Sequence, residues 1–346
     1  MIDNKQYDKP FKTYNEQIEY LKNIYKLEIK NDKFAKYALS TFSYYDLING
    51  YKELFMVNDE FREGTTIEYL MYFYLYDKEF QNLIFRYSLF IENSFKTKLA
   101  YILSEDFGVE QEDYLANKNY NYSYKNKIFL YEVKKDILKH CSTLDNDGNR
   151  VYFQQPSKHY ALHHNHIPAW ILFKNITFAD AISLYKLLKK EQKQKMSNAM
   201  LSYKIPINDK TAFLIPALDL IRNYRNVIAH NLKFVTYTCH KYGLPFNITK
   251  RIINDETVLN GHKKLYDLYA CIIAIYVMID NPFMQAMFFN DILKIRNFNK
   301  LQILGTKNMF DKISDDYLEI TNVKNIFGNF LLYIANALPI KHPFYE

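Results

Sequence analysis

Glycine, proline and cysteine are all scarce in this sequence. Only 8 Gly and 9 Pro occur among 346 residues, too few for the frequent tight turns of a β-sandwich or barrel. The three cysteines, Cys141, Cys239 and Cys271, form no CxxC pair, which disfavours a disulfide framework or a zinc ribbon. We therefore expect helices joined by short loops, in a protein kept in a reducing compartment.

Long hydrophobic runs and an export signal are also lacking. The longest apolar stretch, Leu268 to Ile279, is well short of the roughly 18 residues that indicate a membrane span, and it predicts a buried core helix. The N-terminal string MIDNKQYDKP contains no apolar segment and no small-residue cleavage site. We expect a cytoplasmic protein without a membrane partner.

The sequence is rich in aromatic residues and mildly basic. Hydrophobic residues make up 49% of the chain and aromatic residues 17%, which excludes a disordered tail. The 45 Lys and Arg residues against 38 Asp and Glu give a net charge of +7. This basic excess is compatible with a polyanionic partner but does not identify one.

Helical periodicity dominates the chain and predicts an all-α fold. Short helices are expected within 13–51. A long helix should follow, from a Thr65 N-cap with Glu68 in a capping box to about residue 103, either unbroken or interrupted near Asp77. Further helical patterns lie at 169–188, 211–231, 262–279 and 311–338.

Residues 104–168 form the irregular part of the sequence. A helix at 125–140 and a small hairpin around the DNDG turn at 145–148 are expected there. Apart from this region, a strand is expected only at 234–239. The chain is predicted to be a single elaborated domain, with N-terminal helices at 9–60, a core at about 64–283 and C-terminal helices at 284–346.

The segment IRNYRNVIAHN at 221–231 concentrates cations, amides and one histidine within a well-patterned helix. At about 100° per residue, one arc of about 160° is polar and the opposite arc of about 120° is apolar. The first arc comprises Asp219, Arg222, Asn223, Arg225, Asn226, Ala229 and His230, and the second comprises Ala217, Leu220, Ile221, Tyr224, Val227 and Ile228. One face therefore packs in the core and the other forms a compact polar site.

This polar face suits RNA cleavage by attack of a 2′-hydroxyl on the adjacent phosphate. Arg225 can hold the phosphate bidentately and stabilise its added charge, and His230 can move a proton. Asn226 lies four residues before His230 and can orient it, while Arg222 adds positive charge for the substrate. The scheme requires no metal or other cofactor, and this helix offers no carboxylate cluster to hold a metal.

Strings spread over residues 9–235 carry a family resemblance. RNVIAH at 225–230 lies within the longer string RNYRNVIAHN. The other strings are KPF at 9–11, YYDLINGY at 44–51, IENSFK at 91–96, HY at 159–160, IPAW at 167–170 and ITF at 176–178. Together they resemble the Abi (abortive infection) family, in its AbiD/AbiF-like branch, and RNVIAH matches the R-N-x-x-x-H form of the motif of HEPN ribonucleases.

The resemblance implies an all-α HEPN-type helical bundle with added N- and C-terminal helices and a small irregular or β-hairpin insertion. It implies a homodimer that pairs two motifs in one composite cleft and cleaves RNA without metal, and it makes a structured noncoding RNA a candidate inhibitor. Glu92 would orient Arg225 or His230. Two positions depart from the family pattern, since Asn231 replaces a second histidine and Asp180 stands where glycine is usual.

Plainer explanations exist for each of these features. The motif can be ordinary charge near a helix end, and Glu92 can form an ion pair with Lys96 or Lys98. The histidines at 159, 163, 164 and 166 invite a zinc site, but no cysteine or acidic pair accompanies them, and a basic loop near the RNA is favoured. The lysines at 186, 189, 190 and 193 fit phosphate contacts or, more commonly, a solvated face.

The leading hypothesis is a metal-independent endoribonuclease that acts as an abortive-infection toxin against phage, with Arg225, Asn226 and His230 as catalytic residues. Supporting or RNA-binding candidates are Arg222, Asn231, Glu92, Lys96 and His159. The alternative is an RNA-binding HEPN protein that does not cleave, with a regulatory noncoding RNA as its partner. A third hypothesis is a purely structural partner protein.

Overall fold

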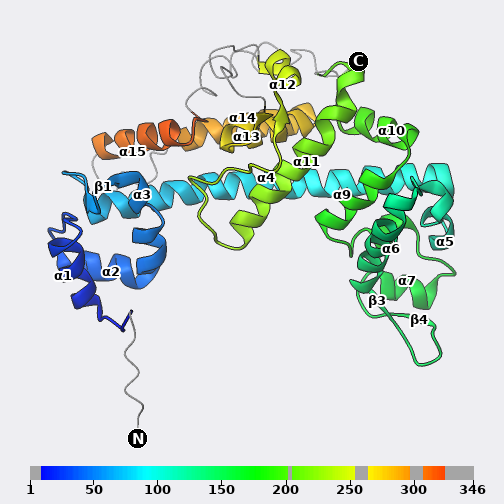
Figure 1. The fold of residues 1–346 in the computed structure, drawn as a ribbon, viewed down its shortest axis with the longest axis horizontal. Coiled ribbons are helices and arrows are strands. Elements are labelled where there is room, and N and C mark those ends of the chain that lie inside the picture. Colours follow the sequence, from blue (N-terminus) through cyan, green and yellow to red (C-terminus); the bar gives the residue numbers. More distant parts are fainter. Residues whose placement is uncertain (1–8, 202–204, 254–263, 297–306, 324–346) are drawn as a thin grey trace, which may run out of the picture. The chain divides into compact units, whose positions relative to one another are not determined.

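The computed structural model describes residues 9–201, 205–253, 264–296 and 307–323, and this part of the chain is mostly helical (Figure 1). Its strands form three antiparallel two-stranded pairs and no larger sheet. The expected all-α fold with small hairpins is confirmed. Two compact units are present, Met1–Gln81 with Lys294–Ile320 and Asn82–Leu293 with Thr321–Glu346. The organisation as one elaborated domain stays a prediction.

Short helices begin the first unit, as the sequence predicts. They are α1 (Tyr14–Asn23), α2 (Asp32–Phe42), the π-helical turn η1 (Tyr45–Asn49) and α3 (Lys52–Phe55), followed by β1 (Met56–Val57) and β2 (Glu60–Phe61), and α15 (Lys307–Ile320) joins them. Thr13 caps α1, because its hydroxyl accepts from the Glu16 N–H while the Glu16 carboxylate accepts from the Thr13 N–H. The β1–β2 hairpin lies where no strand was expected.

The long helix α4 (Ile67–Phe107) is unbroken, and its residues after Gln81 belong to the second unit. Thr66 rather than Thr65 supplies the N-cap, since the Thr66 hydroxyl accepts from the Tyr69 N–H at 3.1 Å. The reason is a backbone pairing that the local pattern does not show. The Glu28 N–H donates to the Thr65 carbonyl and the Ile67 N–H donates to the Glu28 carbonyl, so the helix starts one residue later than predicted.

A buried carboxylate organises the core of the first unit. Asp77 of α4 accepts hydrogen bonds from the Tyr51 hydroxyl at 3.1 Å, the Tyr317 hydroxyl at 2.7 Å and the Gln81 amide at 2.8 Å. Burial raises the pKa of Asp77, and the three donors oppose this rise by stabilising the ionised form. The network joins α4 to α15 and to the start of α3, and its donors satisfy a group that would be costly to bury alone.

The second unit contains the remaining elements. They are α5 (Gln111–Tyr114), the 3-10 turn η2 (Asn117–Asn119), α6 (Tyr124–Lys139), β3 (Ser142–Leu144), β4 (Arg150–Tyr152), α7 (Ser157–His163), α8 (Ala169–Leu172), α9 (Phe178–Leu187), α10 (Lys190–Met200), α11 (Ile207–Ala229), β5 (Leu244–Pro245), α12 (Phe246–Ile253), β6 (Lys264–Leu265), α13 (Leu268–Met278) and most of α14 (Pro282–Arg296). The hairpin expected in 104–168 is confirmed as β3–β4, with Gly148 at φ 82° in its turn.

The helical pattern at 169–188 is two helices instead of one. α9 begins where Thr177 and Asp180 form a capping box, in which the Asp180 carboxylate accepts from the Thr177 N–H and the Thr177 hydroxyl accepts from the Asp180 N–H, both at 3.1 Å. Asp180, at a position where the resemblance leads us to expect glycine, thus fixes the start of α9.

The apolar stretch at 268–279 is the buried helix that the sequence predicts. Every residue of α13 is buried, and the helix begins at Leu268 because Asp267 caps it, later than the 262 expected. The expected strand at 234–239 is wrong, because these residues form turns and irregular backbone. The next strands along the chain are β5 and β6, which pair with each other. Of the helical stretch expected at 311–338, α15 covers the start and residues 324–338 lie outside the described residues. In the described ranges, no helix combines the length and apolarity that crossing a bilayer requires.

Candidate functional site

The helix that carries the motif, α11, separates a core face from a polar face as the sequence predicts. It packs against α13, α10 and α9. The buried residues include Ala217, Leu220, Ile221, Tyr224 and Val227. Arg222, Asn223, Arg225 and Asn226 are half-buried, and Ala229 and His230 are exposed. The exception on the polar arc is Asp219, which is buried.

The helix ends inside the motif. His230 is its C-cap, and Asn231 takes a left-handed conformation with φ 50°. The N–H groups of Asn231 and Leu232 donate to the carbonyls of Ile228 at 3.0 Å and Val227 at 2.9 Å, the pattern of a Schellman motif. Glycine is the usual residue at this position and asparagine the next in line. Asn231 therefore has a structural role, which is to end α11 directly after His230.

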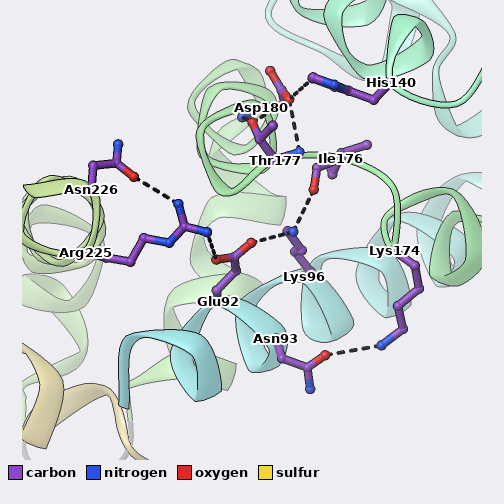
Figure 2. A network of polar contacts seen from close by, with 10 residues as sticks. All are labelled: Glu92, Asn93, Lys96, His140, Lys174, Ile176, Thr177, Asp180, Arg225 and Asn226. Carbon is purple, nitrogen blue, oxygen red and sulfur yellow. Dashed lines mark hydrogen bonds and ion pairs between the residues drawn. The ribbon is translucent and has the colours of Figure 1, made fainter. Parts of the chain in front are cut away.

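Arg225 reaches from α11 to α4. Its Nη1 donates to the Asn226 Oδ1 at 3.1 Å, and its Nη2 lies 3.8 Å from the Glu92 Oε2 (Figure 2). The guanidinium also faces the Phe85 ring, 6.0 Å from the ring centroid. Glu92 thus contacts Arg225, as the resemblance implies. Asn226 bonds to Arg225, and no hydrogen bond joins it to His230 within the described residues, in contrast to the predicted orienting role.

Glu92 contacts a partner from each of the two alternatives that the sequence left open. Its Oε1 lies 2.6 Å from the Lys96 Nζ while its Oε2 faces Arg225. Lys98 instead pairs with Asp280. The side chains of Glu92 and Lys96 are only 13% and 16% exposed, so this charge pair is largely shielded from water. Glu92 therefore lies between two cations, one from its own helix and one from the motif helix.

The polar contacts continue from Lys96 to the start of α9. The Lys96 Nζ donates to the Ile176 carbonyl at 2.7 Å, directly before the α9 capping box. There the Asp180 Oδ2 lies 3.0 Å from the His140 Nε2, which comes from the end of α6 (Figure 2). The loop before α9 is thus tied to α4 and α6, and this tie sets the position of the residues between α8 and α9.

A cavity of about 470 Å³ lies beside Arg225. Its polar wall includes Glu92, Asn93, Lys96, Lys174 and Arg225, and its apolar wall includes Leu89, Trp170, Ile171 and Phe173. Trp170 is 45% exposed although it is the largest side-chain type. A cavity with cations on one side and an accessible indole on the other can bind a nucleotide, since the cations fit its phosphate and the ring fits its base.

Most residues of this cavity are absent from the predicted site, among them Trp170, Lys174 and Asn93. Trp170 is part of the IPAW string and is the single tryptophan of the chain, which is a signal that could have identified it. Asn93 lies in the IENSFK string, whereas Lys174 lies in none of the strings that carry the resemblance. The Lys174 Nζ donates to the Asn93 Oδ1 at 3.2 Å, so their contribution arises from the packing of the α8–α9 loop on α4.

Arg222 belongs to a different group. The buried Asp219 carboxylate lies 2.7 Å from the Lys186 Nζ and 3.9 Å from the Arg222 Nη2. Neither cation lines the cavity beside Arg225. Lys186 is therefore an internal partner of Asp219, which separates it from the other lysines of its predicted set.

The two predicted histidines also lie apart from the cavity wall. His230 is exposed, and among the described residues its imidazole makes no hydrogen bond or ion pair. His159 is exposed on α7, with its ring centroid 4.6 Å from that of His163. Within the ranges that the structure describes, no group of three or more His, Cys, Asp or Glu side chains could hold a metal ion.

A family comparison covers the residues that form this site. The family profile of Abi-like proteins matches residues 37–235, which are 199 of the 346 residues. The match includes α11 with its motif, Glu92 and Trp170, and it leaves out the KPF string at 9–11. Searches of curated proteins and of solved structures give no match. The chain belongs to the Abi-like protein family.

Proposed function

We propose that this protein is a metal-independent endoribonuclease that acts in the cytoplasm as an abortive-infection toxin. Membership of the Abi-like family supports the abortive-infection role. The RNVIAH motif and the Glu92 helix support assignment to the HEPN superfamily, in the AbiD/AbiF-like branch. The observation that carries the proposal is the half-buried guanidinium of Arg225 on the wall of a cavity that also contains the exposed Trp170.

The proposed reaction uses the side chains of the motif. The ribose 2′-oxygen forms a bond to phosphorus while the bond from phosphorus to the 5′-oxygen breaks, which leaves a cyclic phosphate and a 5′-hydroxyl. Arg225 stabilises the negative charge that develops on the phosphate oxygens. His230 takes the proton from the 2′-hydroxyl or gives one to the leaving 5′-oxygen. Loss of one such group typically lowers kcat by about 10²–10³-fold.

Glu92 and Asn226 act as positioning residues in this proposal. The 3.8 Å between Glu92 and Arg225 exceeds a hydrogen-bond distance, and the Glu92 Oε2 and Arg225 Nε are buried with no hydrogen-bond partner in the described residues. The pair therefore lacks the short bidentate geometry that would lock the guanidinium onto the carboxylate. Arg225 keeps the capacity to turn toward a phosphate while Asn226 limits its range.

We propose further that two copies of the chain form one composite site. The support is that His230 is exposed and does not line the cavity that holds Arg225 of the same chain. In a homodimer His230 can act on RNA held by the partner's Arg225. If inactive Arg225→Ala is mixed one to one with inactive His230→Ala and the subunits exchange, a site made from Arg225 of one chain and His230 of the other regains about one quarter of the wild-type activity. Sites that lie within one chain regain none.

The direct test is cleavage of labelled RNA by purified protein in EDTA. Cleavage should be lost in Arg225→Ala and in His230→Ala, and it should persist in the control His240→Ala, which alters another exposed histidine. Retained cleavage in both motif variants would sink the assignment. Growth toxicity on expression that disappears in His230→Ala would exclude a purely structural partner protein.

The alternative function is RNA binding without cleavage, with a regulatory noncoding RNA as the partner. The observation in its favour is that Arg225 already lies beside the Glu92 carboxylate, which partly offsets its charge. This alternative predicts that the wild-type protein binds RNA and leaves it intact in EDTA. It also predicts that Arg225→Ala weakens binding, which filter binding would measure.

A further inference from the structure

A second cavity lies in the same unit, and its wall is strongly basic. It has a volume of about 750 Å³ and includes Lys118, Lys189, Lys190 and Lys193. Among the residues that the structure describes, no aspartate or glutamate lines it. The other polar groups on its wall are Asn117, Asn121, Ser123 and Thr211, and Tyr122 adds an aromatic ring that is 45% exposed. Phosphate groups are the ligands that such a set of donors and cations would bind.

The packing of two loops brings these residues together. The Asn121 N–H donates to the Leu187 carbonyl at 2.8 Å, and Tyr120 and Leu188 form an isolated antiparallel bridge. The loop before α6 is thus joined to the segment that leads into α10. This contact places residues 117–123 beside the lysines at 189, 190 and 193.

The charge of this cavity is not neutralised by nearby groups. Among the described residues, none of its four lysines forms an ion pair, and the neighbouring Glu191 faces Lys195 at 3.9 Å instead. Lys193 is half-buried, and burial lowers the pKa of its amine. A bound anion would offset this cost of burying the charge.

Two helices also begin at this cavity. α6 starts after Ser123 and α10 starts after Lys189, and neither helix has a side-chain hydrogen bond at its N-cap. The first N–H groups of a helix have no partner inside it, and they carry a partial positive charge. These N–H groups add to the positive field of the lysines that line the cavity.

We propose that this lysine-lined cavity binds the phosphate backbone of the RNA on which the motif helix acts. The inference rests on the proposed function for the identity of the ligand. Thr211 belongs to the wall of the cavity and to α11, the helix that also carries Arg225. The two residues are 14 positions apart, about 21 Å along a helix that rises 1.5 Å per residue. An RNA that spans this length would contact both places at once.

The test measures how strongly salt weakens binding of an uncleavable RNA. The probe is a labelled 2′-O-methyl oligonucleotide that is long enough to reach both cavities, so binding is measured whether or not the protein cleaves RNA. The variant is Lys189→Glu/Lys190→Glu/Lys193→Glu. Because each lost phosphate contact reduces the slope of log K against log salt by about 0.7, the slope should fall by about 2.

The matched control is Lys30→Glu/Lys33→Glu/Lys36→Glu, which changes three exposed lysines of the first unit and alters net charge equally. Its slope should equal that of the wild type. Since Lys193 is half-buried, Lys189→Glu/Lys190→Glu serves as a second variant on exposed positions, with an expected fall of about 1.4. Unchanged slopes in both variants, or an equal fall in the control, would overturn the proposal.

Two further measurements separate the possible ligands and the two proposals. If inorganic phosphate or a mononucleotide displaces the labelled RNA as effectively as unlabelled RNA does, the cavity binds a small anion and the RNA assignment is overturned. If the slopes change as expected but wild-type protein leaves cleavable RNA intact, the lysine site stands and the ribonuclease proposal fails. If RNA is cleaved and the slopes do not change, the lysine site fails alone.

Discussion

Glu92→Gln removes the charge between Lys96 and Arg225 and tests how the motif arginine is held. Glutamine keeps the shape of the side chain and an acceptor oxygen for Lys96, at 2.6 Å in the native structure. Hydrogen bonds to charged groups are worth about 1.5–3 kcal/mol, and loss of the carboxylate charge moves the Lys96 bond from the upper toward the lower end of this range. The Arg225 contact at 3.8 Å is too long for a hydrogen bond and adds a Coulombic attraction only.

The expected loss follows from these contributions and from exposure. The side chains of Glu92, Lys96 and Arg225 are 13%, 16% and 31% exposed, so solvent screens part of the attraction. We expect Glu92→Gln to lower the free energy of unfolding by about 1–2 kcal/mol. Urea denaturation at constant m-value measures this change.

Glu19→Gln is the matched control. Glu19 lies 3.9 Å from Lys22 and is 61% exposed, so the same substitution should change the free energy of unfolding by less than about 0.5 kcal/mol. Equal values for Glu92→Gln and Glu19→Gln would refute the reasoning about the shielded pair.

A kinetic measurement separates a positioning role from a structural one. If Glu92 positions Arg225, Glu92→Gln should lower kcat for RNA cleavage about tenfold or more with little change in KM, because small displacements of a catalytic group are costly. Glu92→Asp restores the charge and should recover part of kcat. A loss of stability with unchanged kcat would show that Glu92 only supports the fold.

Three further predictions concern other parts of the chain. Burial raises the pKa of Asp77, so the folded state binds more protons than the unfolded state between about pH 4 and the raised pKa. The free energy of unfolding should therefore fall as pH rises through this window. Urea unfolding at several pH values measures this fall, and Asp77→Asn should abolish it. At Asn231, with φ 50°, Asn231→Gly should be neutral or slightly stabilising and Asn231→Val should cost about 1 kcal/mol in thermal or urea unfolding; a neutral valine would contradict the capping role. Trp170→Ala should weaken binding of uncleavable RNA by about 1–3 kcal/mol while Trp170→Phe retains most of it, and equal anisotropy titrations for both variants would rule out base stacking.

Local patterns were sufficient for the type and position of most helices. The scarcity of glycine and proline excluded a β-fold, and the apolar stretch of α13 identified a buried helix. The periodicity around Arg225 separated the core face of α11 from its polar face. These features depend on side-chain spacing along one helix, which is why a single sequence contains them.

Helix ends were less predictable because they depend on contacts with distant residues. Thr66 caps α4 in place of Thr65 since the backbone of Glu28 pairs on both sides of it. Asp180, which departs from the family pattern, caps α9 and contacts His140. The sequence drew attention to Asn231 because it replaces a histidine. The structure shows that Asn231 adopts the left-handed conformation that ends α11, which explains why asparagine stands there.

The sequence by itself determined the helical fold, the family and the side chains of the motif, because each of these is written in local spacing or in short strings. The tertiary structure alone decided which charges meet. It directed Arg225 toward Glu92 and Asn226, assigned Lys186 to Asp219, and gathered the remaining lysines of that set around a second cavity. Ion pairs and cavities form between helices that are far apart in sequence, and their partners are therefore fixed only when those helices pack.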